Sequence, residues 1–585
     1  MKMKKIFYFI LLFVFLKGFA SDQIALDYDR VAPNFPKEEK EEIIEDKQEK
    51  LAPPVEKLSD EVLIEQVHTV ILTSFATRVP YDLCSGSKGL VVYDLILPQN
   101  AYNKFQKTLE PMFCNKPLTE RLMGDLKNAI INLYTELAHP LILVQIPEQD
   151  ITEGTLIIEI KESVLEDIVI EGNKYFSTKQ LLSDISLKKG KGINTNQLVD
   201  DLSWINRNPF RSASAVFSPG KKPYTTDVEI SMKERFPLRV YASLDNTGYK
   251  ITDKWRANAG FNWGNAWNLG HILGYQFTHS LSGNYYYSHT ATYLWPFSWR
   301  HLLNVYGGYA SEKGKQMQNF LSKGISYQIS GRYIVPLPSF EKVLQEVSLG
   351  ADFKRTNNNL DYGEVTVLNN SLDVFQFALK YELSRDTQKN QLLFDVEAFL
   401  SPNKFFPGQN TQLYDEMRLG ATPRYYYGKM DLQYTASFWR NSSFHYRLRG
   451  QLASENLLPT EQFGLGGFYT VRGYSERQVN VDNAILLNFE YHLPSIPLLS
   501  DGYVRHINDR LTVLAFFDYG LGAMHKKEEA ANDLPQYGLM SIGPGIRYEI
   551  IPYLKLHYDY GFQLLKIKNE NHVTGRPHFR ILISF

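Results

Sequence analysis

The chain has 585 residues, with 63 basic and 64 acidic side chains and a formal net charge of −1 at pH 7. That length is too great for a single compact core, and the near-zero charge gives no bulk electrostatic reason to bind nucleic acid. Tyrosine (37) and phenylalanine (35) are abundant, yet the mean hydropathy is only −0.29. Many aromatic residues without long apolar runs are unusual for a helical membrane protein and typical of a lipid-embedded β-barrel.

The longest apolar run lies at the N-terminus. Lysines precede the apolar residues 6–16, and Gly18-Phe19-Ala20 offers a small-x-small cleavage site. An apolar run of this length is too short to span a membrane as a helix. Residues 1–20 are therefore predicted to be a secretory signal peptide.

A charged segment follows the predicted signal peptide. From Lys37 to Lys50, 11 of 14 residues are charged, and Pro53-Pro54 comes next. Such a composition cannot bury a core, so residues 21–60 are predicted to be a solvated helix or a disordered linker.

Residues 61–162 are predicted to form a compact α/β module. A strand is expected over Val62–Leu72, and two more over residues 140–146 and 154–161. Between them, apolar residues at helical spacing predict an amphipathic helix. That helix is marked by Leu118, Leu122, Leu126, Ile130, Leu133 and Leu137.

The same module holds both cysteines, Cys84 and Cys114. An exported chain meets an oxidising compartment, which favours a disulfide between them. Closing such a loop contributes roughly 3–4 kcal/mol in the chain-entropy model. Two free, buried thiols are the alternative.

Residues 163–236 predict a second module with the same order of elements. Ser177-x-x-Gln180 is a capping-box start for a short helix, and a second helix is expected to start near Asn194. From Val228 to Met232, apolar residues alternate with polar ones, as in a half-buried strand.

Residues 237–585 have a different hydropathy pattern. Alternating apolar and polar segments recur, separated by turns rich in Gly, Asn and Asp. Roughly sixteen strands of about 22 residues each, turns included, would fill this length as an antiparallel transmembrane barrel. The last alternating segment ends on Phe585.

Two short motifs lie near the C-terminus of the predicted barrel. The first, Val471-Arg472-Gly473-Tyr474, sits in a glycine-rich stretch that indicates a loop. The second, written Phe516-x-Asp518-x-Gly520, lies on an alternating segment. Strand periodicity places Asp518 on the polar, lumen-facing side. A loop arginine and a lumen carboxylate together predict a loop that folds into the pore and is held there.

These motifs resemble those of TpsB transporters, the outer-membrane proteins of two-partner secretion (haemolysin activator/secretion proteins of the ShlB/FhaC/HecB type). In that family a VRGY tetrad lies at the tip of an inward-folded loop and an F-x-D-x-G motif on the lumen wall. Two further segments carry the resemblance, Asp245-Asn246-x-Gly248 at the start of the barrel and residues 147–156 at the end of the first module. It covers nearly all of the mature chain and is weakest over residues 21–60.

The resemblance implies a fold and a function. The fold class expected is an all-β membrane barrel of about 16 antiparallel strands at the C-terminus, preceded by two small α/β POTRA domains. The POTRA domains would lie in the periplasm and capture an unfolded, secreted exoprotein of the TpsA type. The barrel would then translocate this client to the cell surface. Residues 37–50 could form a helix that plugs the barrel, with a bare linker as the alternative.

Several residues receive expected roles from this interpretation. Client docking is assigned to the first module, at Leu118, Leu122, Leu126, Leu141, Leu143 and Gln145. Phe585 is the expected signal for the barrel-assembly machinery that inserts the protein into outer-membrane lipid. Arg547 and Glu549 are expected to be solvated lumen lining.

Two common enzymatic signatures are absent from the chain. The sequence carries no P-loop motif and no H-E-x-x-H zinc motif, so no enzyme activity, metal or cofactor is expected. One alternative function is an outer-membrane assembly insertase of the BamA type, which usually carries more than two POTRA domains. A passive porin, the other alternative, would have no reason to carry them.

Overall fold

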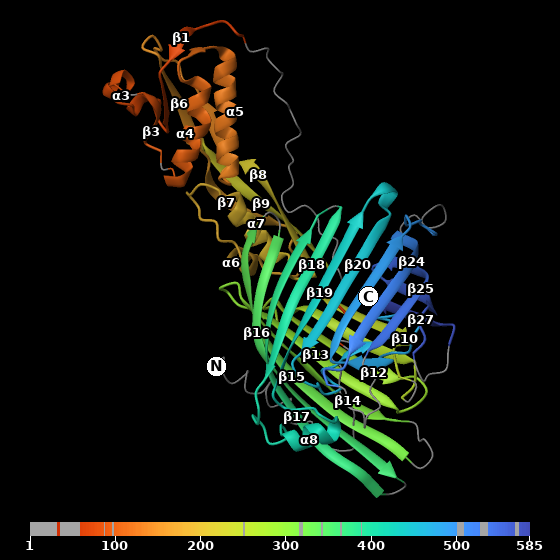
Figure 1. Cartoon of the computed structure of the whole chain (residues 1–585). Coiled ribbons are helices and arrows are strands. Elements are labelled where there is room, and N and C mark those ends of the chain that lie inside the picture. Colours follow the sequence, from red (N-terminus) through yellow and green to blue (C-terminus); the bar gives the residue numbers. More distant parts are fainter. Residues whose placement is uncertain are drawn as a thin grey trace. The chain divides into compact units, whose positions relative to one another are not determined.

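The computed structural model describes residues 32–35, 59–86, 88–95, 97, 99–249, 252–314, 320–340, 343–362, 365–387, 389–499, 508–526, 536–567 and 573–585. The chain divides into two compact units, residues 1–36 with 237–585, and residues 37–236 (Figure 1). The predicted signal peptide and most of the predicted linker lie outside the described residues. No helix among those described is long and apolar enough to cross a membrane.

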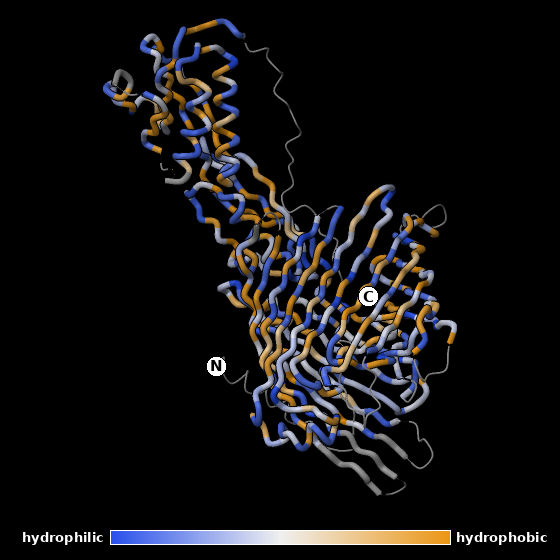
Figure 2. Tube along the Cα trace, viewed as in Figure 1, coloured by the Kyte–Doolittle hydropathy of each residue, from blue (hydrophilic) through white to orange (hydrophobic). Residues whose placement is uncertain are grey.

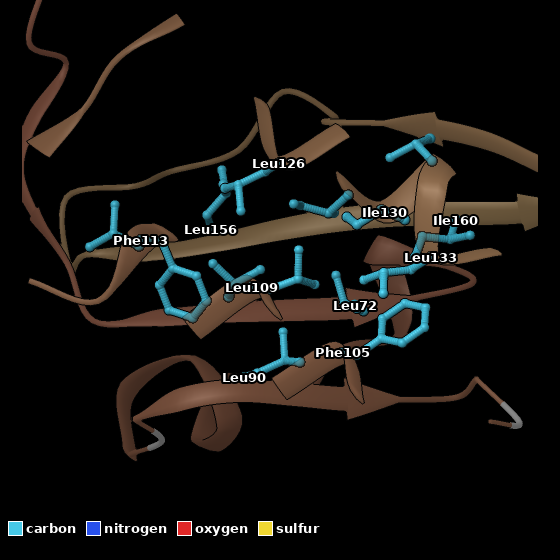
Figure 3. Close-up of a cluster of buried hydrophobic side chains, with 14 of the residues drawn as sticks. Leu72, Leu90, Phe105, Leu109, Phe113, Leu126, Ile130, Leu133, Leu156 and Ile160 are labelled. Atoms are coloured by element: carbon cyan, nitrogen blue, oxygen red, sulfur yellow. The ribbon is translucent and has the colours of Figure 1, made fainter. Parts of the chain in front are cut away.

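The first α/β module is built on a four-stranded mixed sheet. Its central strand β2 (Thr69–Thr73) is buried throughout and runs parallel to both neighbours. Apolar side chains of the sheet and of two helices meet in one cluster (Figure 3). The other elements are η1 (Ala76–Arg78), α3 (Tyr81–Gly86), β3 (Gly89–Tyr93), α4 (Gln99–Phe113), α5 (Glu120–Glu136), β5 (Ile142–Gln145) and β6 (Thr155–Glu162). The sheet order is β3-β2-β6-β5, so β5 is an edge strand.

The strand predicted over Val62–Leu72 is divided in two. β1 (Ile64–Val67) pairs with β4 (Lys116–Leu118) in a separate two-stranded sheet, and only β2 enters the main sheet. The chain changes partner at His68, whose N–H donates to the Gly154 carbonyl. Leu118 therefore lies on β4 and not on the predicted helix, which begins after the Thr119 cap.

The predicted disulfide between Cys84 and Cys114 is wrong for this structure, in which Cys114 is a free cysteine. Cys114 follows α4 and packs against the apolar cluster of the first module, where a thiol behaves as a small apolar side chain. Burial, together with the nearby Glu110 carboxylate, raises the pKa of the Cys114 thiol. The side chain of Cys84 lies outside the described residues.

The second module has a three-stranded sheet in the order β7-β9-β8. Ser177 caps its first helix as predicted, accepting a hydrogen bond from the Gln180 N–H. Asn194 caps the second helix in the same way, through the Gln197 N–H. The elements are β7 (Val164–Glu171), α6 (Thr178–Ser183), α7 (Thr195–Ile205), β8 (Arg211–Pro219) and β9 (Thr225–Glu234).

Sixteen antiparallel strands, counted over the described residues, close into a barrel. Hydrophobic positions recur along them (Figure 2). The strands are β10 (Leu238–Asp245), β11 (Arg256–Ala266), β12 (His271–Ser280), β13 (Tyr286–Pro296), β14 (Leu302–Lys313), β15 (Phe320–Phe340), β16 (Val343–Tyr362), β17 (Val365–Asp386), β18 (Asn390–Ser401), β19 (Tyr425–Ser437), β20 (Ser443–Ala453), β23 (Asn483–His492), β24 (Asn508–Ala523), β25 (Tyr537–Ile551), β26 (Leu554–Gln563) and β27 (Gly575–Ser584).

Alternate residues of each strand face the lumen. On β24, Thr512, Leu514, Phe516 and Asp518 are buried, whereas Val513 between them is exposed on the outer face. This is the predicted phase, and it places an apolar surface where lipid would lie.

The barrel closes between its first and last strands. β10 pairs with β27 over Tyr241–Asp245. Beyond this ladder, Val240 and Phe585 exchange backbone hydrogen bonds of 3.0 and 2.9 Å. The C-terminal Phe585 thus sits at the seam. Its role as an assembly signal stays a prediction.

Candidate functional site

A long loop connects β20 to β23 and carries the Val471–Tyr474 motif. It contains a short hairpin of β21 (Phe463–Leu465) and β22 (Val479–Val481). The motif is deeply buried, with Val471 0%, Arg472 4% and Tyr474 1% exposed. Since its contacts are with lumen-facing residues of the wall, the loop folds into the barrel.

Arg472 makes a two-pronged contact with Asp518. Its Nε and Nη2 atoms donate to the two carboxylate oxygens, each at 2.8 Å. The Arg472 backbone N–H also donates to Asp518, at 3.0 Å. The Phe516 ring lies beneath the guanidinium, 3.6 Å from Cζ to the ring centroid. This planar, bidentate geometry specifies one loop position.

The remaining Arg472 nitrogen reaches two more carboxylates. Nη1 donates to Glu490 on β23 at 2.5 Å and to Asp559 on β26 at 3.2 Å. Arg547 on β25 adds a second cation, donating to Asp559 at 2.5 and 2.9 Å. Three carboxylates and two guanidiniums therefore form one buried cluster, which we call the tip network.

Two lumen-facing residues of β25, Arg547 and Glu549, depart from the sequence-based expectation. Arg547 was expected to be solvated lumen lining, but its side chain is only 16% exposed because it pairs with Asp559. Glu549 is 15% exposed and pairs with Arg510. Asp559 alternates with the apolar residues Tyr558 and Tyr560 on β26, but the sequence does not mark it as a partner of Arg472. Only its strand phase pointed to it.

Glycines make room for the loop. Gly473 has φ +90°, and a Cβ there would meet the Gly561 carbonyl oxygen at 2.6 Å. A Cβ on Gly520 would meet Leu465 and Val471 side-chain atoms of the loop at 2.9 Å each. The glycine of the Phe516-x-Asp518-x-Gly520 motif thus provides the floor on which the loop packs.

Further hydrogen bonds fix the backbone around the tip. The Gly473 N–H donates to His578 Nε2 at 2.8 Å, and Gln563 donates to the Gly473 carbonyl at 2.7 Å. The Tyr474 hydroxyl lies within hydrogen-bond distance of the carbonyls of Met540 and Leu565, at 3.0 and 2.6 Å, and donates its one hydrogen between them. The loop is thereby tied to strands β25, β26 and β27 as well as to β24.

Two more carboxylates hold the arms of the loop, the segments on either side of its Val471–Tyr474 tip, and no sequence motif marks either of them. Glu461 is 2% exposed, and Lys354 on β16 donates to it at 2.7 Å. Tyr427 on β19 donates to the same carboxylate, also at 2.7 Å. Asp482 is fully buried and pairs with Arg418, which follows α8 (Thr411–Met417). The loop is therefore anchored at its tip and on both arms.

The residues assigned to client docking separate in the structure. Leu118 and Leu126 are fully buried in the core of the first module, so their assignment to a docking surface is wrong (Figure 3 shows Leu126). Leu122 packs against the same core, and Leu141 packs against that of the second module. Leu143 is 47% exposed, and Gln145 lies two residues further along the same edge strand.

A comparison with protein families gives a match over residues 225–548, to the haemolysin secretion/activation proteins ShlB/FhaC/HecB. The match covers more than half of the chain. The chain belongs to this family. As a ShlB/FhaC/HecB protein it is an outer-membrane β-barrel transporter for a partner protein, with its POTRA modules in the periplasm. This membership favours secretion over the alternative of an assembly insertase.

Individual relatives agree with this assignment. The heme/hemopexin transporter protein HuxB of Haemophilus influenzae (strain 86-028NP) is 23% identical over 452 residues, 73% of this chain and 74% of HuxB. The outer membrane transporter CdiB of Dickeya dadantii (strain 3937) is 21% identical over 445 residues, again 73% and 74%.

Solved structures share the fold. CdiB from Escherichia coli has a TM-score of 0.73 at 15% identity, covering 92% of this chain and 93% of that one. CdiB from Acinetobacter baumannii has a TM-score of 0.65 at 17% identity and covers 95% of both chains.

Proposed function

We propose that this ShlB/FhaC/HecB protein exports a TpsA-type exoprotein as an extended chain, and that the tip network holds the pore-filling loop in its resting position. The observation that carries the proposal is the set of Arg472 contacts with Asp518, Glu490 and Asp559, which come from three different strands. A loop fixed this firmly inside the lumen must stay in one place or move as a unit when a client passes.

The energetics of the tip network support a positional role. Buried ion pairs add little net stability, because desolvation offsets most of the attraction. Breaking one, however, leaves uncompensated buried charge and costs about 3–5 kcal/mol. The network therefore discriminates between loop positions more than it stabilises the barrel, which its strand ladder already holds.

The edge strand β5 is the proposed docking site for the client. It pairs with β6 on one side, and Leu143 and Gln145 share its face away from Val144, which is buried. An exposed strand edge offers unpaired backbone groups to which an extended chain can add as a further strand. Alternate side chains of the edge would then contribute selectivity.

Recognition by β5 can be tested in the native host without knowing the client. Deleting the gene should remove one large protein from the culture medium, and the full-length gene should restore it. A variant lacking residues 61–162 should insert normally, as shown by heat-modifiable gel mobility, and fail to restore secretion. Val144→Pro should also fail. Ser163 donates to Leu141, so the alternation of an antiparallel pair turns the backbone of Leu143 toward β6 and that of Val144 toward the free edge, where a proline blocks strand addition and spares the β5–β6 ladder.

Leu143→Ala is the matched control on the same strand. It keeps the backbone edge and should retain most secretion. Normal secretion by the deletion variant would exclude the docking role of the first module. Outer-membrane insertion of new barrels is the alternative readout, and its failure on gene deletion would indicate an assembly insertase.

Partners in the host beyond the client are also proposed. The exposed apolar outer face, with residues such as Leu349 and Leu452, suits outer-membrane lipid. The seam position of Phe585 fits a role in recognition by the barrel-assembly machinery. Truncation of Phe585 should lower the amount of inserted protein in whole cells.

A further inference from the structure

A short N-terminal segment, Ala32–Phe35, lies against the lumen wall of the barrel unit. The Asn34 backbone N–H donates to the Tyr241 hydroxyl at 2.9 Å. Arg239 donates to the Asn34 backbone carbonyl at 2.8 Å. Both hydrogen-bonding groups of the Asn34 main chain are thus satisfied by side chains of β10.

The wall at this point is shaped by two glycines. A Cβ on Gly260 would meet the Tyr241 hydroxyl oxygen at 2.4 Å, so the Tyr241 side chain lies over β11 where no side chain intervenes. Its hydroxyl reaches Gln276 on β12, at 3.0 Å. A Cβ on Gly274 would meet Phe35 at 2.8 Å and Pro33 at 3.0 Å. Gly274 thus leaves a space that these two rings fill.

The wall also holds an unused donor. Asn262 on β11 accepts a hydrogen bond from Arg239 at 3.1 Å and is fully buried. Its Nδ2 atom has no hydrogen-bond partner within the described part of the chain. A buried amide donor without a partner is costly. Arg239 donates both to Asn262 and to the Asn34 carbonyl, so this donor lies near the bound main chain, where a further carbonyl would satisfy it.

We propose that the inward face of β10–β12, around Arg239, Tyr241 and Gly274, is a main-chain binding site for an extended polypeptide, occupied in this structure by the chain's own Ala32–Phe35. Recognition of Asn34 uses its N–H and C=O, which every non-proline residue possesses. Ala32 and Phe35 each precede a proline, which restricts them to extended conformations. The segment therefore presents itself as an extended client would.

This inference deepens the proposed function and rests on it for the identity of the natural occupant. A client segment of similar form would compete with Ala32–Phe35 for the same donors and acceptor. The site would then hold the passing chain by its backbone, with little demand on its sequence, and a proline or aromatic side chain over Gly274 would strengthen the contact.

The test uses the purified full-length protein and a synthetic probe. The probe is a 12-residue peptide with Ala-Pro-Asn-Phe at its centre, Gly-Ser flanks, and photoreactive benzoylphenylalanine in place of the phenylalanine. In a Pro33→Ser/Phe35→Ser variant, the segment Ala32–Phe35 loses its two ring contacts over Gly274 and should leave the site on β10–β12. Photocrosslinking of the probe to β10–β13, mapped by mass spectrometry, should rise about tenfold over the unmodified protein.

Two changes separate main-chain recognition from unspecific adhesion. Methylating the backbone nitrogen of the probe's asparagine removes the donor to Tyr241 and should lower crosslinking about tenfold. Changing that asparagine to alanine keeps the backbone N–H and should leave crosslinking unchanged. In the vacated protein, Gly274→Val should abolish crosslinking. Gly331→Val is the matched control, because a Cβ at Gly331 on the outer face of β15 meets nothing within 4 Å.

Crosslinking that survives both N-methylation and Gly274→Val, or that spreads evenly over the barrel, would overturn the proposal. So would its absence in the vacated protein. Export plays no part in this measurement. A negative result would therefore leave the secretion role untouched, whereas a failed secretion test would leave the peptide site without its proposed occupant.

Discussion

Asp482 accepts hydrogen bonds from both Nη atoms of Arg418, at 2.5 and 2.7 Å, and so joins the loop carrying α8 to the end of the loop carrying Arg472. The same carboxylate accepts from the backbone N–H groups of Leu457 and His525, each at 2.9 Å. Three loops therefore meet on one buried carboxylate. Because strands alternate in direction from β10 onward, these loops leave the barrel at the same, outer end (Figure 1 shows α8 there).

The contacts of Asp482 with Arg418, Leu457 and His525, which we call the outer clamp, should restrain all three loops together. Asp482→Ala removes the carboxylate partner of Arg418, which keeps its contacts with the Leu457 carbonyl and the Met524 sulfur, and takes the acceptor from two backbone N–H groups. Asp482→Asn keeps a weaker acceptor. We expect Asp482→Ala to increase protease cleavage in the α8 loop and residues 454–482 several-fold, with Asp482→Asn intermediate. Limited proteolysis of the inserted protein measures this. Unchanged cleavage in Asp482→Ala would show that the clamp does not restrain the loops.

Removing Arg472 should be more disruptive than removing Asp518. Arg472→Ala leaves three buried carboxylates facing one guanidinium, whereas Asp518→Asn leaves two of each charge. We expect Arg472→Ala to cut secretion to a low but measurable level and to change single-channel conductance, while the protein stays abundant and inserted. Asp518→Asn should be milder. Arg472→Lys should rescue poorly, since an ammonium cannot make the planar two-pronged contact.

The coupling of Arg472 and Asp518 is a separate measurement. If they act as a pair, Arg472→Ala combined with Asp518→Ala should be little worse in secretion than Arg472→Ala alone. Fully additive defects, or normal secretion by Arg472→Ala, would contradict a shared role.

A steric change can displace the loop without altering any charge. Gly520→Val places methyl groups where Leu465 and Val471 now pack. We expect the loop to leave its position, raising mean conductance in planar bilayers and lowering secretion. Gly331→Val, on the open outer face, should leave both unchanged. Equal behaviour of the two variants would mean that the loop does not depend on the Gly520 floor.

The Cys114 thiol should react slowly in the native protein. Burial and Glu110 raise the pKa of this thiol, so its thiolate fraction at pH 8 is smaller than that of an ordinary cysteine. In a Cys84→Ser background, labelling by a thiol reagent should accelerate as pH rises from 7 to 9 and become fast on denaturation. Rapid native labelling at pH 7 would contradict the partly buried position against the apolar cluster.

The α/β modules show how far local sequence signals extend. Ser177-x-x-Gln180 predicted a helix start through side-chain capping, which depends on residues three apart. The region from Val62 to Leu72 was misread because its two halves pair in different sheets, a choice made by distant residues such as Gly154 and Leu118. Burial of Leu126 in a core likewise depends on which face of α5 meets the sheet.

For the site, the sequence alone determined the strand phase that puts Asp518 in the lumen, and its motifs pointed to an inward loop bearing Arg472. Period-two alternation is a local property, so it could be derived residue by residue. Only the tertiary structure decided that Asp559 and Glu490 share Arg472 with Asp518, that Asp482 clamps Arg418, and that Gly274 receives Phe35. Those contacts join positions up to hundreds of residues apart, and barrel closure, which no local pattern encodes, brings them together.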